Sequence, residues 1–133
     1  MILGLRKTID NESILTVVYL AKEKDVIEVV AGLELSSLDQ DFVYLENLFV
    51  RQDYRGKGIA KDLIRWAKGK CMTLGKERLS LFVRKGNRTA IDLYEAEGFD
   101  YLDSHFGLDY CMTYQFSYPE ETPQQKAFNE CCD

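Results

Sequence analysis

The strongest constraint on the fold is a change of hydrophobic period at the stretch RQDYRGKGIAKD, residues 51–62. Before it, residues 42–50 (FVYLENLFV) are almost continuously apolar and predict a central strand, with Asn47 as a candidate β-bulge. After it, apolar residues recur at helical spacing over 59–71, which predicts an amphipathic helix ending near Gly75. A strand and the start of a helix therefore meet at a glycine-containing loop.

The flanking sequence predicts a mixed sheet. β-Branched and apolar runs predict further strands over 14–22, 26–35, 78–83, 100–105 and 110–118. A second helix is expected over 87–97, with Asn87 as its N-cap and Gly98 after its end. This order predicts an α/β fold of the α+β type, in which helices pack on a mixed, largely antiparallel sheet with one central β-α-β crossover.

Length and composition indicate a single domain over residues 1–118 and a polar tail over 119–133, which we expect to be mobile. No apolar run is long enough to span a bilayer and the first residues lack the layout of a signal peptide, so we expect a cytoplasmic protein without a membrane partner. The four cysteines form no C-x-x-C pair and His105 is the single histidine. We therefore expect reduced thiols and no metal site.

The net charge of -5 is unevenly distributed. Residues 51–88 hold twelve Lys or Arg and three Asp or Glu, whereas the rest of the chain holds five basic and nineteen acidic residues. This asymmetry favours an anionic ligand near the middle segment and a cationic partner elsewhere. A solvated helix face is the plainer explanation for any single lysine.

The loop lies where a helix N-terminus presents unpaired N–H groups, and phosphate is the usual ligand of such a site. The Walker loop is excluded because Ile59 follows Gly58 where that motif needs lysine. The dinucleotide fingerprint is excluded because Lys61 stands where it needs a third Gly or Ala. Residues 55–60 (RGKGIA) fit the remaining pattern, R/Q-x-x-G-x-G/A.

That pattern resembles the pyrophosphate motif of the GNAT superfamily of acyl-CoA-dependent N-acyltransferases. Two more stretches are similar to the family in order and separation: YLENLFV (44–50), and VRKGNRTAIDLYEAEGF (83–99). The resemblance covers residues 14–116. The family usually begins with a strand and two helices that wall the acceptor site, and we expect these to be missing before Ile14. The acceptor site would then be more open, or completed by another chain.

The resemblance implies how the donor, acetyl-CoA, is held. Backbone N–H groups of the loop would bind the pyrophosphate, and the basic side chains would add charge attraction. The loop residues are Arg55, Gly56, Lys57, Gly58, Ile59, Ala60 and Lys61. The strand edge at Leu48, Phe49 and Val50 would pair with the pantetheine arm, and an N–H near Leu48 would stabilise the oxyanion.

The resemblance also implies two catalytic side chains. Glu46 would help to deprotonate the amine, as a glutamate does at this place in polyamine acetyltransferases; it is otherwise a charged residue on a solvent-facing strand. Tyr94 would protonate the departing thiolate; it is otherwise a core tyrosine. Asn87 caps its helix, bonds the pantetheine, or does both.

The function predicted is an N-acetyltransferase that transfers acetyl to a primary amine by direct attack in a ternary complex. The acceptor is a small-molecule amine, or a protein lysine or N-terminus, and the acidic remainder of the chain favours a cationic one. The alternatives are a non-catalytic acyl-CoA sensor and nucleic-acid binding. The second is disfavoured because the basic segment lacks interleaved aromatic residues. A homodimer is left open.

Overall fold

The computed structural model describes residues 2–9 and 13–119. Within these residues seven strands form one sheet, in the order β1-β2-β3-β4-β5-β7-β6. The strands are β1 (Ile2–Ile9), β2 (Leu15–Glu23), β3 (Val26–Ser36), β4 (Phe42–Val50), β5 (Arg78–Arg84), β6 (Asp100–Phe106) and β7 (Asp109–Gln115). The helices are the short 3-10 turn η1 (Gln52–Tyr54), α1 (Ile59–Thr73) and α2 (Arg88–Ala96).

The sheet confirms the predicted mixed topology. β4 is the middle strand, and β4-α1-β5 is the expected crossover because β4 and β5 pair in parallel, whereas the other neighbouring strands pair antiparallel. Asn87 is confirmed as the N-cap of α2, since its side chain accepts a hydrogen bond from the Ala90 N–H (3.2 Å). The last strand ends at Gln115, three residues earlier than expected.

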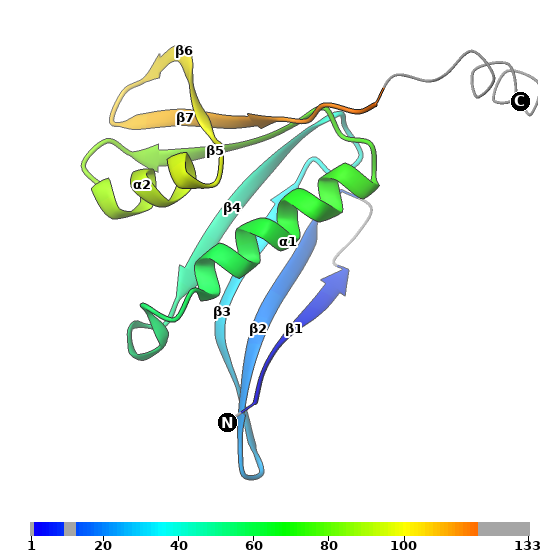
Figure 1. Ribbon diagram of the computed structural model, residues 1–133, viewed down its shortest axis with the longest axis vertical. Coiled ribbons are helices and arrows are strands. Elements are labelled where there is room, and N and C mark those ends of the chain that lie inside the picture. Colours follow the sequence, from blue (N-terminus) through cyan, green and yellow to red (C-terminus); the bar gives the residue numbers. More distant parts are fainter. Residues whose placement is uncertain (1, 10–12, 120–133) are drawn as a thin grey trace, which may run out of the picture.

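Both helices pack on the same face of the sheet, as Figure 1 shows for α1 across β2 to β4 and α2 beside β5. Alternate strand residues point into this layer and are at most 6% exposed. They include Leu33 and Leu35 on β3, Val43 and Leu45 on β4, and Leu79, Leu81 and Val83 on β5. From α1, Leu63, Ile64 and Ala67 meet them with 0% exposure. The core therefore forms where every second residue of the strands packs against the residues that recur every 3.6 positions on α1.

β4 and β5 pair over only three residues and then diverge. Their register runs from Phe42 opposite Arg78 to Tyr44 opposite Ser80, and Figure 1 shows the two strands separating beyond this point. On the other edge of β4, the pairing with β3 is irregular around Asn47, which has a φ of 54°. Asn47 is therefore the predicted bulge, and it bends the strand where β5 leaves it.

One expectation about the N-terminus is wrong. The sequence was expected to lack the initial strand as well as the two helices, but β1 is present and pairs with β2 along its whole length. An edge strand takes its hydrogen bonds from its neighbour, so a weak pattern in ILGLRKTI still gives a strand. Only residues 10–14 separate β1 from β2, which is too short for two helices. The predicted tail lies, from residue 120 on, outside the described residues.

Two glycine-to-alanine changes test the packing. At Gly98, φ is +91° and a Cβ atom would stand 3.0 Å from the Tyr114 ring, so Gly98→Ala is expected to cost about 1–3 kcal/mol of unfolding free energy. Gly69 lies inside α1 with no atom within 4 Å of a Cβ, so Gly69→Ala is expected to add about 0.5–1 kcal/mol. Urea unfolding measures both. A Gly98→Ala variant as stable as the parent protein would contradict the packing described.

Candidate active site

The loop between β4 and α1 is shaped by two glycines in the left-handed region. Gly56 has a φ of 78°, and Gly58, the N-cap residue of α1, has a φ of 80°. A Cβ atom at either position would meet no atom within 4 Å. The first hydrogen bond of α1 joins the Asp62 N–H to the Gly58 carbonyl (3.0 Å), so the N–H groups of residues 59–61 have no partner within the helix. The loop thus offers backbone donors and the positive end of the α1 dipole beside open space.

The predicted basic residues of the loop differ in their contacts. The Arg55 Nε donates a hydrogen bond to the Val50 carbonyl (3.0 Å), so Arg55 ties the loop to the end of β4. The Lys57 ammonium lies 5.2 Å from the centre of the Tyr54 ring. Lys61 is exposed and forms no ion pair or hydrogen bond within the described residues. Arg55 and Lys57 shape the loop, and Lys61 is available to an anion.

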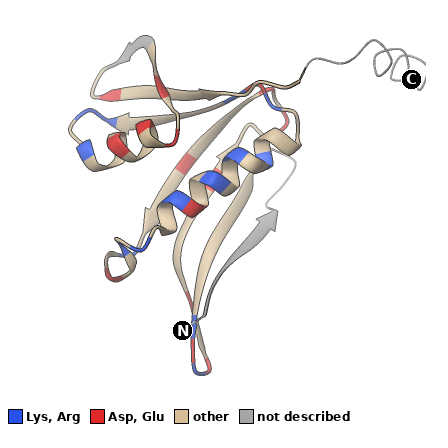
Figure 2. Ribbon diagram, in the orientation of Figure 1, with Lys and Arg blue, Asp and Glu red and all other residues tan. Residues whose placement is uncertain are grey.

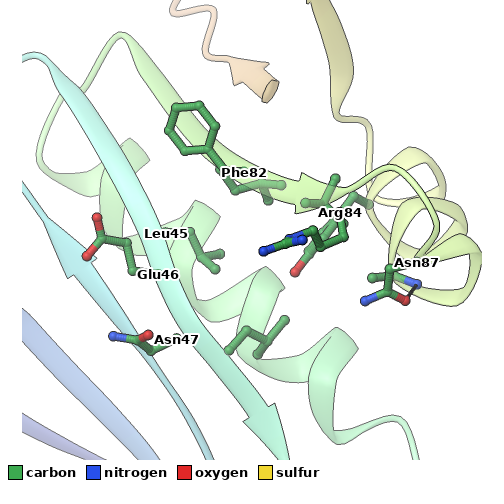
Figure 3. Close-up of a pocket in the computed structure, with 11 residues that line it drawn as sticks. Leu45, Glu46, Asn47, Phe82, Arg84 and Asn87 are labelled. Carbon is green, nitrogen blue, oxygen red and sulfur yellow. Dashed lines mark hydrogen bonds between the residues drawn. The ribbon is translucent and has the colours of Figure 1, made fainter. Parts of the chain in front are cut away.

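The divergence of β4 and β5 leaves a cavity of about 400 Å³ (Figure 3). β4 forms one wall, and β5 and the start of α2 form the other. Its lining residues are Leu45, Glu46, Asn47, Leu48, Leu81, Phe82, Val83, Arg84, Asn87, Ala90 and Tyr94. Four predicted site residues are therefore brought together here: Glu46, Leu48, Asn87 and Tyr94. Phe49 and Val50 lie further along β4, and the loop follows them, so these predicted residues are outside the cavity.

Glu46 lies on β4 directly opposite Glu34 on β3. Glu34 accepts a hydrogen bond from the Asn47 side-chain amide (3.2 Å). Glu46 is exposed, and its carboxylate has no hydrogen bond or ion pair within the described residues. In Figure 3 its side chain points toward the β3 side of β4, away from Arg84 and Asn87. The carboxylate is therefore free to accept a proton from a group on that side.

Tyr94 is 7% exposed and packs edge-on against Phe99, with ring centres 5.8 Å apart. Its hydroxyl makes no hydrogen bond to a described residue, yet the side chain lines the cavity. Burial raises the pKa of Tyr94 above its ordinary value, so the phenol stays protonated throughout the neutral range. A group in the cavity would thus face a neutral O–H donor.

Sequence reasoning missed the part of the wall supplied by β5. Phe82 stacks on Tyr44 of β4, with ring centres 6.2 Å apart and an angle of 6° between the planes. Arg84 forms an ion pair with Asp109 on β7 (3.0 Å). The β4-α1-β5 crossover is the feature that could have revealed this wall. Because parallel pairing places residue 78 beside residue 42, residues 81–84 come to lie across from residues 45–48.

An ion pair between an exposed arginine and a buried glutamate joins the two helices of the site. The Glu97 side chain, just after α2, is 6% exposed and accepts a hydrogen bond from the Arg65 Nε on α1 (2.9 Å). The Lys68 ammonium donates a hydrogen bond to the Glu97 main-chain carbonyl (2.7 Å). The negative end of the α2 dipole also stabilises a cation at this position. The helix that starts at the glycine loop therefore holds the end of the helix that carries Tyr94.

Figure 2 shows where the uneven charge lies. Basic residues line α1 and the loop before it, whereas acidic residues lie on α2, within β4 and near the ends of other strands.

A family model described as "Acetyltransferase (GNAT) family" matches residues 5–99, more than half of the chain. The chain belongs to the GNAT acetyltransferase family. The resemblance seen in the sequence is thereby confirmed, and so is the fold expected from it.

Relatives agree with this assignment at a distance. The chain is 38% identical to thialysine N-epsilon-acetyltransferase of Bos taurus over 56 residues, which are 42% of this chain and 33% of that protein. It thus spans about a third of the length of this curated relative. The PaiA N-acetyltransferase of Thermoplasma acidophilum, solved with coenzyme A, has a TM-score of 0.67 at 22% identity, covering 78% of this chain and 62% of that one.

A third GNAT protein, the ribosomal-protein-S18-alanine N-acetyltransferase of Escherichia coli, has a TM-score of 0.70 at 23% identity. The match covers 84% of this chain and 75% of that one. Identities this low establish the shared fold alone. Along the described residues, no helix has the length and apolar character needed to cross a bilayer.

The Arg65–Glu97 pair gives a stability prediction. Arg65→Ala leaves a buried carboxylate without its cation, so we expect a loss of about 1–3 kcal/mol in unfolding free energy. Arg88→Ala is the matched control, because it breaks an exposed pair with Asp92 (2.8 Å) that should contribute far less to stability. Urea unfolding compares them. Equal losses would mean that Arg65 does not hold α2.

Proposed function

We propose that the protein is an N-acetyltransferase that moves the acetyl group of acetyl-CoA to a primary amine within a ternary complex. The observation that carries the proposal is the cavity between β4 and β5. It brings together Glu46, Leu48, Asn87 and Tyr94, which come from two separate stretches of the sequence. Membership of the GNAT family supports the same conclusion.

The loop fits the pyrophosphate of an acyl-CoA. Side chains at Gly56 and Gly58 would fill the space that a phosphate needs, and both positions lack them. The N–H groups at the start of α1 supply donors, and Lys61 supplies a free cation nearby. The edge of β4 beyond Tyr44 no longer pairs with β5, so its backbone is available to an extended amide such as pantetheine.

When bound, acetyl-CoA supplies an activated thioester. The Leu48 main chain borders the cavity on β4, and we assign its N–H as donor to the acetyl carbonyl oxygen. Glu46 takes a proton from the amine as the new C–N bond forms. Tyr94 donates its proton to the sulfur as the C–S bond breaks, and raising its pKa by burial keeps that proton in place at neutral pH.

Direct transfer needs no nucleophile from the protein. Cys71 and Cys111 are buried free thiols, and neither lines the cavity. Burial raises the pKa of Cys71 to about 11 and also raises that of Cys111, so neither thiol is ionised at neutral pH. The balanced reaction converts an amine and acetyl-CoA into an acetamide and free coenzyme A.

Two alanine variants test donor binding. Gly58→Ala places a Cβ in the phosphate cradle, so we expect coenzyme A affinity to fall about 10- to 100-fold, the effect of losing one charge-assisted hydrogen bond. Gly75→Ala imposes similar backbone strain (φ +69°) at the far end of α1 and should leave affinity unchanged. Isothermal titration calorimetry measures both. Unaltered affinity in Gly58→Ala would remove the loop from the donor site.

Substitution of the two catalytic candidates tests turnover. Tyr94→Phe removes the donor proton and should lower kcat by about 100-fold with little change in coenzyme A affinity. Tyr114→Phe, at a ring that packs on the core away from the cavity, is the control and should retain kcat. Glu46→Gln should lower kcat about 10- to 100-fold. Release of free thiol over an amine panel gives the rates.

The pH profile tests the role of Tyr94. The amine acceptor must be neutral to attack the thioester, so kcat/KM should rise with pH through the neutral range. Because burial raises the pKa of Tyr94 above its ordinary value, loss of its proton should cause no decline in kcat/KM through the neutral range. A falling limb below pH 9 that vanishes in Tyr94→Phe would contradict this assignment. Coenzyme A binding without turnover on any amine would instead indicate a non-catalytic acyl-CoA sensor.

A further inference from the structure

The face of the sheet opposite the helices carries a band of apolar side chains. Residues directly opposite each other in a pair share a face, so Val29 and its partner Leu20 lie on the face of Val18. Ile27 joins them opposite Lys22. Ile27 is 60% exposed and Val29 is 47% exposed. Within the described residues, no helix covers this face, since α1 and α2 both pack on the other one.

The band continues across β4 to β5 and reaches the mouth of the cavity. Phe49 lies over Gly32, where the ring would be 3.0 Å from a Cβ atom, and it is 47% exposed. The stacked pair of Tyr44 and Phe82 follows, with Phe82 51% exposed and lining the cavity. Four adjacent strands span about 15 Å, more than a small amine can cover. An exposed apolar surface of this extent is typical of a macromolecular contact.

Two carboxylates stand within the band beside the cavity. Glu34 and Glu46 are direct cross-strand neighbours, and like charges in this arrangement destabilise a sheet unless a cation lies between them. The Asn47 amide donates to Glu34 but carries no charge (3.2 Å). A lysine matches this surface, because its apolar stem lies along hydrophobic groups while its ammonium reaches the carboxylates.

We propose that the helix-free face is the acceptor-docking surface and that the acceptor is a polypeptide lysine. This inference rests on the proposed function. The lysine stem lies over Tyr44 and Phe82, its ammonium is attracted by Glu34 and Glu46, and flanking residues cover Ile27 and Val29. The ammonium yields one proton to solvent and a second to Glu46 as the N–C bond forms, while the C–S bond breaks and Tyr94 protonates the sulfur.

The test compares one amine in two settings. Full-length protein and acetyl-CoA are given either a pool of capped 11-residue peptides with a central lysine and randomised flanks, or N-acetyl-lysine methylamide. Spermidine serves as a small triamine. We expect kcat/KM to be at least about tenfold higher for the pool, with acetylated products enriched in apolar flanks, because burying one exposed side chain is worth that much. Equal values for the pool and either small amine would overturn the proposal.

Surface variants then locate the docking site. Val29→Ser and Ile27→Ser, far from the cavity, should raise KM for the enriched peptides at least fivefold and leave the methylamide unaffected. Met72→Ser is the matched control, since Met72 is exposed to a similar extent (48%) on α1. Glu34→Gln should raise KM for the peptides without changing coenzyme A affinity. Unchanged peptide KM in both serine variants would overturn the assignment of this face.

Two measurements separate failure of the inference from failure of the proposed function. If no acceptor turns over, anisotropy of fluorescein-labelled peptides from the pool still reports docking: binding that Val29→Ser weakens supports the face, and no binding overturns it. Light scattering tests whether a second copy of this chain occupies the face instead. If the protein is a dimer, and if Val29→Ser and Ile27→Ser dissociate it while Met72→Ser does not, the face serves self-association and the proposal is overturned.

Discussion

The short parallel pairing of β4 with β5 is the constraint on which the site depends. Three residue pairs hold the strands together at their start, and the bulge at Asn47 then bends β4 while β5 continues toward α2. Two hydrogen-bonded strands leave no space between them, so a cavity within a sheet requires such a separation. The same separation exposes a backbone edge for an extended ligand and brings β4 opposite α2. Glu46 and Tyr94 thus come from different elements and line one cavity.

The helices keep this opening in shape. α1 packs an apolar stripe on the sheet and begins at the glycine loop, so the loop is anchored to the core through Ile59 and Leu63. Its outward face carries Arg65 and Lys68, which hold Glu97 at the end of α2. Since burying a carboxylate is costly without a partner, this contact favours a single arrangement of the two helices. Contacts between α1 and α2 therefore link the position of the glycine loop to that of Tyr94.

In the proposed function, each face of the sheet serves a different substrate. The helix-bearing face supplies the loop and Tyr94, which serve the donor. The opposite face supplies Glu34, Glu46 and an apolar band, which suit an acceptor that covers several strands. Residues 10–14 are all that joins β1 to β2, and among the described residues no helix lies on this face. An open face favours an acceptor that brings its own apolar surface.

Local sequence determined most of the elements of this protein. The strands from β2 to β7, both helices, the bulge at Asn47 and the cap at Asn87 follow from periodicity, glycine and capping, which act over a few residues. The family and the loop motif were recognisable for the same reason. Only the tertiary structure decided what depends on pairing between distant segments: the presence of β1, the β5 wall at Phe82 and Arg84, the Arg65–Glu97 contact, and the placement of Glu34 opposite Glu46. Strand order and register arise from packing of the whole sheet, and no short stretch of sequence encodes them.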